Sequence, residues 1–231
     1  MILSARLKAV LSLIDRCDVL ADIGCDHGKL ALAACKDGLC RVCLLSDISS
    51  GSLKKARQLF DKEGCGDKAE FFVGDGLSAL SRQPDTCIIA GMGGYQIINI
   101  IKQSPFKCST YILQPMKNSD LLRAFLCRVG YSIVYDRVVR DGGKFYDIIK
   151  AKYIGEGQVS GITRNQILFG ATNLEDMHPD FKAYLDYVIT KSNRILAGRV
   201  SGKRRDELSQ LAAAASKLLE GAAAREFSEG G

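Results

Sequence analysis

The chain has 231 residues, of which 47% are hydrophobic and 25% are charged, and its formal net charge is +6 at pH 7. This length suits one α/β domain with an appendage. No apolar run reaches the length of a membrane span, which excludes a transmembrane protein, and no membrane partner is expected. The segment 1–20 carries charges at helical intervals and lacks a signal peptide's uncharged core, so it predicts an amphipathic helix of a cytoplasmic protein.

The basic excess is confined to the first part of the chain. Residues 1–154 contain 22 Lys and Arg against 16 Asp and Glu, whereas residues 155–231 contain 10 of each. A basic excess alone is weak evidence for a polyanionic partner. Its position indicates that such a partner would face residues 1–154.

Nine cysteines, an odd number, lie mostly in apolar runs, which predicts reduced and buried thiols. Cys40 and Cys43 form a C-x-x-C pair, a spacing that zinc and redox sites also use. The chain has no second such pair and only two histidines, so we expect two thiols at the entry to a buried strand and no metal.

Short apolar runs alternate with amphipathic ones along residues 18–130. The apolar runs predict strands. Several of the helices between them are marked by a serine at the start and a glycine just past the end. Continuous β-α alternation implies a parallel, doubly wound sheet. The predicted strands are 18–24, 41–49, 69–76, 85–94 and 109–115, and the predicted helices are 28–38, 49–64, 77–82, 95–103 and 119–130.

The pattern changes at residues 131–153, where two strand-like runs flank "RDGGK" and predict a hairpin. One antiparallel strand closing a parallel sheet is the seven-stranded, Rossmann-like arrangement of class I methyltransferases. An ordinary NAD-binding Rossmann domain lacks that hairpin. The predicted first domain is therefore α/β and spans residues 1–154.

Residues 155–231 are predicted to hold a linker and a helical hairpin with a disordered tail at 226–231. The linker, 154–170, is polar and interrupted by glycines. Two runs with heptad-like spacing follow and predict an antiparallel coiled-coil hairpin. Their apolar or small positions are Phe181, Leu185, Val188, Ser192 and Ile195, then Leu208, Leu211, Ala215, Leu218 and Ala222.

Four strand ends, "DIGCDHG", "SDIS", "GDG" and "AGMGG", carry glycine or polar residues just past an apolar run. In an open α/β sheet these ends line one crevice, and each suits one part of S-adenosylmethionine. Gly24 lets the ligand approach the backbone closely. Asp47 can accept hydrogen bonds from the ribose hydroxyls, and Asp75 can accept one from the adenine amino group. A helix cap is the alternative role for Asp47. The predicted cofactor-binding residues are Asp22, Gly24, Cys25, Asp47, Ile48, Asp75, Gly76, Ala90 and Gly91.

The stretches "LADIGCDHGKLAL", "GDGL", "IAGMGG" and "LQP" together resemble the bacterial tRNA (adenine-22 N1)-methyltransferase family. The resemblance covers nearly the whole chain, including an initial Arg-Leu helix and the C-terminal hairpin. It implies an S-adenosylmethionine-dependent enzyme that methylates N1 of an adenine in tRNA.

Asp26 and His27 occupy a turn in which most methyltransferases have glycine at the first of these positions. N1 of adenine has a free lone pair, and methylation makes the ring cationic. A carboxylate nearby would stabilise that charge or accept a proton, so Asp26 is a candidate catalytic residue, with His27 orienting it. The alternatives for Asp26 are a turn or helix cap, or a contact to the donor's ammonium group.

N1 lies on the Watson–Crick edge, so the target base must be loosened or flipped before it reaches the pocket. Tyr95 is predicted either to stack on that base or to be buried in the first turn of a helix. The basic residues near the hairpin tip are predicted to hold tRNA, with a solvated turn or a dimerising coiled coil as the alternatives. The predicted substrate residues are Met92, Gly93, Gly94, Tyr95, Gln114, Pro115, Arg194, Arg199, Lys203, Arg204 and Arg205.

Three other functions are compatible with parts of the sequence. A class I methyltransferase could act on another RNA or on a small molecule. A noncatalytic RNA-binding protein could retain this fold after losing its cofactor-binding residues. The presence of Asp22, Gly24, Asp47 and Asp75 argues against such a loss. An NAD-dependent oxidoreductase is disfavoured because G-x-G-x-x-G is absent. The oligomeric state is left open.

Overall fold

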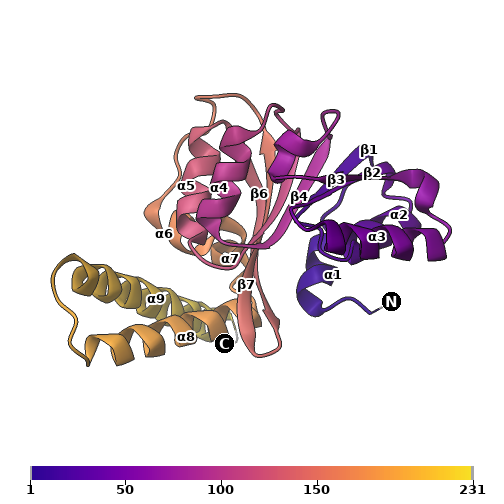
Figure 1. Cartoon of the computed structure of the whole chain (residues 1–231). Helices are drawn as coiled ribbons and strands as arrows, with labels where there is room; N and C mark the ends of the chain where they lie inside the picture. Colours follow the sequence, from indigo (N-terminus) through magenta and orange to yellow (C-terminus); the bar gives the residue numbers. More distant parts are fainter. Residues whose placement is uncertain (1, 230–231) are drawn as a thin grey trace. The chain divides into compact units, whose positions relative to one another are not determined.

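A seven-stranded sheet with the order β3-β2-β1-β4-β5-β7-β6 forms the centre of the first part of the chain (Figure 1). The structure is a computed structural model that describes residues 2–229, without the side chains of 226–229. Strands β1 to β6 run in the same direction, and β7 runs antiparallel between β5 and β6, which confirms the predicted class I methyltransferase sheet. The strands are β1 (Cys17–Ile23), β2 (Cys40–Asp47), β3 (Ala69–Val73), β4 (Thr86–Met92), β5 (Thr110–Pro115), β6 (Tyr131–Asp141) and β7 (Lys144–Tyr153).

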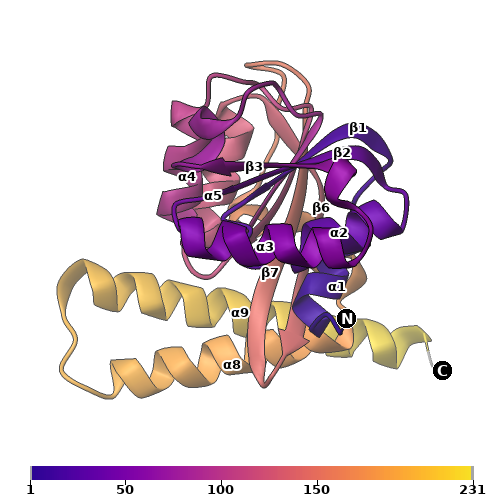
Figure 2. The same cartoon turned by 45° about the vertical axis from the view of Figure 1, so that its right-hand side comes forward.

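Helices cover both faces of the sheet (Figures 1 and 2). Successive strand side chains point to opposite faces, so Leu20 and Leu45 pack on one side while Ala21 and Leu44 pack on the other. The predicted helix at 77–82 is instead a short 3-10 turn, η2 (Gly76–Ala79). The remaining elements are α1 (Ala5–Leu11), α2 (Lys29–Lys36), α3 (Ser50–Lys62), η1 (Gly66–Lys68), α4 (Gly94–Gln103) and α5 (Ser119–Arg128).

All nine cysteines are free, and seven of them are buried, as the sequence predicted. The Sγ atoms of Cys40 and Cys43 lie 3.2 Å apart at the start of β2. Among the side chains of residues 2–225, no group of three or more His, Cys, Asp or Glu is arranged to hold a metal ion. No helix in the same residues has the length and apolar character that crossing a membrane requires.

The chain divides into two compact units, Met1–Ala171 and Thr172–Gly231. The predicted linker contains an unpredicted helix, α6 (Arg164–Phe169), which begins with a capping box between Thr163 and Gln166. The helices α7 (Ala171–Asp176), α8 (Pro179–Leu196) and α9 (Gly202–Glu229) follow.

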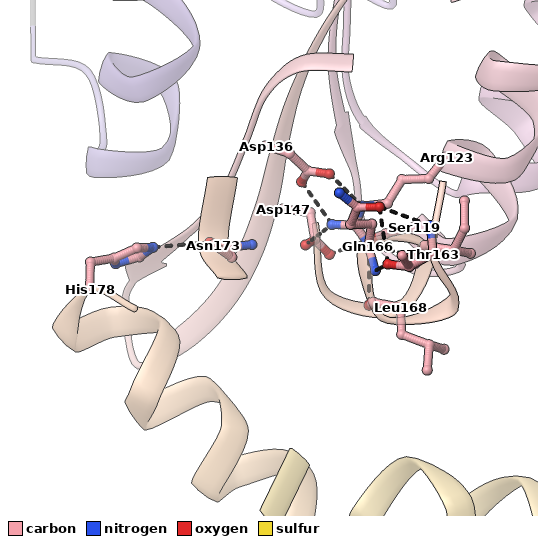
Figure 3. Close-up of polar contacts among 10 residues, drawn as sticks. Ser119, Arg123, Asp136, Asp147, Thr163, Gln166, Leu168, Asn173 and His178 are labelled. Atoms are coloured by element: carbon pink, nitrogen blue, oxygen red, sulfur yellow. Dashed lines mark hydrogen bonds and ion pairs between the residues drawn. The ribbon is translucent and has the colours of Figure 1, made fainter. Parts of the chain in front are cut away.

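The position of α6 depends on a buried ionic network centred on Arg123 (Figure 3). The Arg123 side chain is 1% exposed. Its guanidinium donates to both carboxylate oxygens of Asp136, at 2.6 and 2.8 Å, and to Asp147 at 2.6 Å. It also donates to the carbonyls of Ile167 and Leu168, both at 3.3 Å, in the last turn of α6. Arg123 therefore joins α5, the β6–β7 hairpin and α6.

Burial alone would lower the pKa of Arg123, but the carboxylates of Asp136 and Asp147 raise it above its usual value. Burial raises the pKa of Asp136, against the opposing effect of Arg123. A buried charge is tolerated only when it is paired and hydrogen-bonded, and this network satisfies both conditions.

In the second unit, α8 and α9 pack against each other as the predicted helical hairpin. Phe181, Leu185, Val188 and Ser192 are buried on α8, as their spacing predicted. Before α8, His178 Nε2 lies 3.0 Å from Asn173 Oδ1 (Figure 3). The backbone of α9 is helical to Glu229, within the segment 226–231 that was predicted to be disordered, and residues 230–231 lie outside the described part.

Replacing Arg123 with alanine should lower the free energy of unfolding by about 3–5 kcal/mol, because Asp136 would stay buried without its cation. Urea denaturation at pH 7 measures this change. Arg82→Ala is the matched control, since it removes an exposed ion pair with Glu70 and should cost less than about 1 kcal/mol. Equal losses in the two variants would show that the buried network does not stabilise the fold.

Candidate active site

The turn between β1 and α2 crosses the carboxyl end of the sheet and is held by backbone hydrogen bonds. The N–H groups of Gly24 and Cys25 donate to the Ser46 carbonyl at 2.8 and 3.2 Å. Gly24 has φ +68°, and a Cβ at this position would overlap Met92 Cε. Glycine is therefore favoured here, because an L side chain is strained at this φ and would displace the end of the Met92 side chain.

Asp26, two residues later, also has a left-handed backbone, with φ 50°. Its N–H donates to Asp47 Oδ2 at 3.0 Å, and Asp47 Oδ1 accepts the Ser49 N–H at 2.8 Å. Asp and Asn tolerate this conformation better than other residues with a Cβ. The carboxylate at the end of β2 therefore fixes the turn after β1 and also orders the start of α3.

The side chains of Asp26 and His27 point away from the core, 74% and 38% exposed respectively. His27 Nε2 lies 3.5 Å from Asp26 Oδ1 and 3.4 Å from Lys55 Nζ. The imidazole thus lies beside a carboxylate and an ammonium group. This arrangement restrains the ring and keeps Asp26 accessible to a ligand.

A pocket of about 140 Å³ opens beside this turn. Arg6 and Lys29, which had not been predicted as site residues, contribute side chains to its lining together with Leu7 and Leu30. The structure brings six of the predicted site residues together there: Asp22, Gly24, Cys25, Asp26, His27 and Ala90.

Asp22 is the buried carboxyl group of this pocket, with 4% of its surface exposed. Burial raises its pKa to about 7, a hydrogen bond from the Ala31 backbone opposes the shift, and the Asp47 charge adds to it. It forms no ion pair with any residue that the structure describes. A cation entering the pocket would stabilise its ionised form.

Arg6, on α1, is one of the site residues that sequence reasoning missed. Its guanidinium donates to Gln114 Oε1, which also accepts the Gly91 N–H at 3.0 Å. The guanidinium lies 5.3 Å from the centroid of the Tyr146 ring. The Arg6 N–H donates to Asp141 Oδ2 at 3.2 Å, and contacts from Ser4 and Arg6 lower the pKa of Asp141. The β6–β7 hairpin thus holds Arg6 at the pocket.

Gln114, predicted to contact substrate, is fully buried. Its Nε2 donates to the Pro115 carbonyl at 3.0 Å and to Met116 Sδ at 3.6 Å. Both ends of the amide are therefore bonded to protein groups. In this structure Gln114 supports Arg6 and the turn at Gly91.

The ends of β2 and β3 lie side by side, with Asp47 paired to Val73 in the sheet. Two apolar side chains are exposed at this edge, Ile48 by 77% and Val73 by 63%. Asp75 is exposed just beyond them, and the carbonyl of Gly76 accepts the Ser46 hydroxyl at 3.1 Å. Exposed apolar surface flanked by carboxylates suits a planar ligand with hydroxyl or amino donors.

The end of β4 forms the next part of the same edge. Gly94 donates its N–H to the Lys117 carbonyl at 2.8 Å, and a Cβ on Gly94 would overlap the Asn118 carbonyl oxygen. Tyr95 is 61% exposed, so the alternative that it is buried in the first helical turn is wrong. Met116 is 50% exposed at the end of β5.

The predicted RNA-binding basic residues belong to the second unit. They lie in the last turn of α8, in the loop after it and in the first turn of α9. Arg205 donates to the Val200 carbonyl at 3.2 Å, which stabilises this loop. The five residues, Arg194, Arg199, Lys203, Arg204 and Arg205, are all exposed.

Comparisons with known proteins show the family to which the chain belongs. A family model described as a methyltransferase domain matches residues 3–149. A Mycoplasma genitalium protein named "Putative tRNA methyltransferase MG248" is 30% identical over 186 residues, 78% of this chain and 83% of that protein. The tRNA (adenine(22)-N(1))-methyltransferase of Bacillus subtilis is 29% identical over 154 residues, 65% of each chain.

The crystal structure of Streptococcus pneumoniae Sp1610 in complex with S-adenosyl-L-methionine is similar with a TM-score of 0.84 and 25% identity. The similarity covers 94% of this chain and all of that one. The fold and the matched domain define a class I methyltransferase, which excludes the NAD-dependent oxidoreductase. The chain belongs to the bacterial tRNA (adenine-22 N1)-methyltransferase family, as its motifs predicted.

The raised pKa of Asp22 predicts a loss of stability with rising pH. Between the unfolded pKa near 4 and the folded pKa of about 7, the folded chain holds a proton that the unfolded chain has released. The free energy of unfolding should therefore fall by about 2–3 kcal/mol from pH 5 to pH 8 through this group. Asp22→Asn should remove that part of the pH dependence, as measured by urea denaturation.

Asp18→Asn is the control for Asp22→Asn, because Asp18 is exposed on the same strand. It should retain the pH dependence of the unmodified chain. Parallel stability curves for Asp22→Asn and the unmodified chain would show that Asp22 titrates normally.

Proposed function

We propose that the chain transfers a methyl group from S-adenosylmethionine to N1 of an adenine in tRNA, the reaction named for the Bacillus subtilis relative. The observation that carries the proposal is the exposed carboxylate of Asp26, whose backbone is held by Asp47. Asp26 lines the pocket of about 140 Å³ beside the β1–α2 turn, which we call the donor pocket. Bacterial tRNA is cytoplasmic, so the proposed site of action is the cytoplasm.

The pocket residues fit S-adenosylmethionine. Gly24 leaves the backbone open where a Cβ would not fit, and the buried Asp22 suits a cationic group of the methionine part. Both Asp47 oxygens already accept backbone N–H groups, and each has a second lone pair for a ribose hydroxyl. Ile48 and Val73 would flank the adenine, with Asp75 at its amino group.

When bound, S-adenosylmethionine supplies an electrophilic methyl group on a sulfonium. The residues of the chain have a different task, because adenine N1 needs no base to expose its lone pair. As N1 is methylated the ring becomes cationic, and the Asp26 carboxylate stabilises that charge or accepts a proton from the amino group. His27, beside Asp26 and Lys55, orients the carboxylate.

The target adenine must leave its stack to present N1. Tyr95 and Met116 provide exposed surface at the neighbouring strand ends against which an extruded base can stack. Gly93 leaves the backbone uncovered by a Cβ at this edge, whereas Gly94 packs against the Asn118 carbonyl. The basic excess of residues 1–154 attracts the tRNA backbone to this side of the protein.

Nucleoside analysis tests the proposal directly. A tRNA transcript with adenine at position 22 is incubated with the protein and S-adenosylmethionine, digested and analysed by mass spectrometry. We expect 1-methyladenosine in this transcript and none in a transcript with guanine at position 22. Methylation of both transcripts would refute the site specificity, and absence of 1-methyladenosine from both would refute the proposed reaction.

Two variants separate the charge of Asp26 from its turn geometry. Asp26→Asn keeps the shape and the left-handed preference, and Asp26→Gly keeps the turn without a side chain. Both should bind S-adenosylhomocysteine within about threefold of the unmodified protein and fold normally. Both should lower single-turnover methyl transfer about a hundredfold, the usual scale for losing an electrostatic stabiliser. Near-normal transfer by both would leave Asp26 as a turn residue only.

The basic residues at the tip of the α8–α9 hairpin are proposed to hold tRNA. Replacing Lys203, Arg204 and Arg205 with alanine should weaken tRNA binding about tenfold and reduce its salt dependence, with donor binding unchanged. Filter binding at several salt concentrations measures both effects. Lys191→Ala/Lys217→Ala serves as the control for charges elsewhere on the hairpin. If the triple variant binds tRNA normally, the tip is a solvated turn.

A further inference from the structure

A second pocket, of about 370 Å³, lies at the amino ends of the strands, where β5 and β6 begin. The donor pocket lies at the carboxyl ends. The last turns of α4 and α5 form its walls together with the segment that precedes β5. It shares no lining residue with the donor pocket, and it is the larger of the two. The methyl-transfer site described above leaves this pocket without a function.

Aromatic side chains make up much of the lining. Phe106, Tyr111, Phe125 and Tyr131 all contribute. The rings of Tyr111 and Tyr131 lie 5.1 Å apart at an interplanar angle of 59°. Such a lining favours a flat, largely apolar ligand, because ring faces gain contact area without a large entropic cost.

The charged residues of the pocket are predominantly basic. Lys107 is paired with Glu156 at 2.9 Å, so these two charges compensate each other. Lys102 Nζ and Arg128 Cζ lie 5.7 and 5.8 Å from the centroid of the Phe125 ring. Neither forms an ion pair with a residue in the described part of the chain. Two positive charges therefore remain available to an anionic ligand.

Tyr111 forms the fully buried inner end of this lining. Burial is the main cause that raises the pKa of its hydroxyl, and the neighbouring Cys87 and Cys108 thiols add to the shift. The ring therefore closes the pocket from the core side and offers no charge to a ligand.

We propose that this pocket binds a small planar aromatic molecule that carries an anionic group. The aromatic side chains contact its ring, and Lys102 and Arg128 neutralise its charge. An aromatic carboxylic acid and a mononucleotide share this chemistry, so both are tested.

Isothermal titration calorimetry on the full chain, with the donor pocket saturated by S-adenosylhomocysteine, tests the proposal. Two pairs of probes differ chiefly in charge: 1-naphthoate with 1-naphthamide, and adenosine monophosphate with adenosine. In at least one pair the anion should bind about tenfold more tightly than its neutral partner. Preference in the first pair identifies an aromatic acid, and preference in the second identifies a nucleotide.

The variant Lys102→Ala/Arg128→Ala should reduce that preference to less than about threefold. Lys54→Ala/Lys62→Ala, which removes two exposed lysines on α3, should retain it. The proposal is wrong if neither anion shows the preference, or if Lys102→Ala/Arg128→Ala preserves it.

Discussion

The site depends on one carboxylate that bonds to two neighbouring segments. Asp47 accepts the N–H of Asp26 from the turn after β1 and the N–H of Ser49 before α3. The first bond stabilises a left-handed residue that would otherwise be strained, and the second orders the start of a helix. Because Asp26 is fixed in this conformation, its side chain lies exposed at the pocket, where the proposed methyl transfer would use its negative charge.

Asp22 and Arg123 show two different ways of burying a charged residue. Arg123 has two carboxylates and two backbone carbonyls around it, so it stays ionised and joins α5, α6 and the β6–β7 hairpin. Asp22 has no cation among the described residues, and burial raises its pKa to about 7. The first arrangement stabilises the fold, whereas the second leaves a group whose ionised form is favoured when a cation binds. A cationic methyl donor matches that requirement.

The sequence predicted the sheet and which strand ends meet at one edge, because both follow from local patterns. Alternating apolar runs mark the strands, and parallel strands bring Gly24, Asp47 and Asp75 to one edge regardless of packing details. The contacts that were missed join distant residues. Arg6 meets a glutamine 108 positions away, and α6 is held by an arginine 44 positions before it. No local motif encodes such pairs, and the polar composition of 154–170 concealed a helix that tertiary contacts stabilise.

Amide hydrogen exchange of Asp26 tests most directly whether Asp47 fixes the turn after β1. Nuclear magnetic resonance compares the unmodified protein with Asp47→Ala, and the Gly24 amide is the internal reference because it bonds to the Ser46 carbonyl. The account predicts that Asp26 exchange accelerates about tenfold or more in Asp47→Ala while Gly24 exchange is unchanged. Equal Asp26 exchange in the two proteins would contradict the account, because the turn would then hold without the carboxylate.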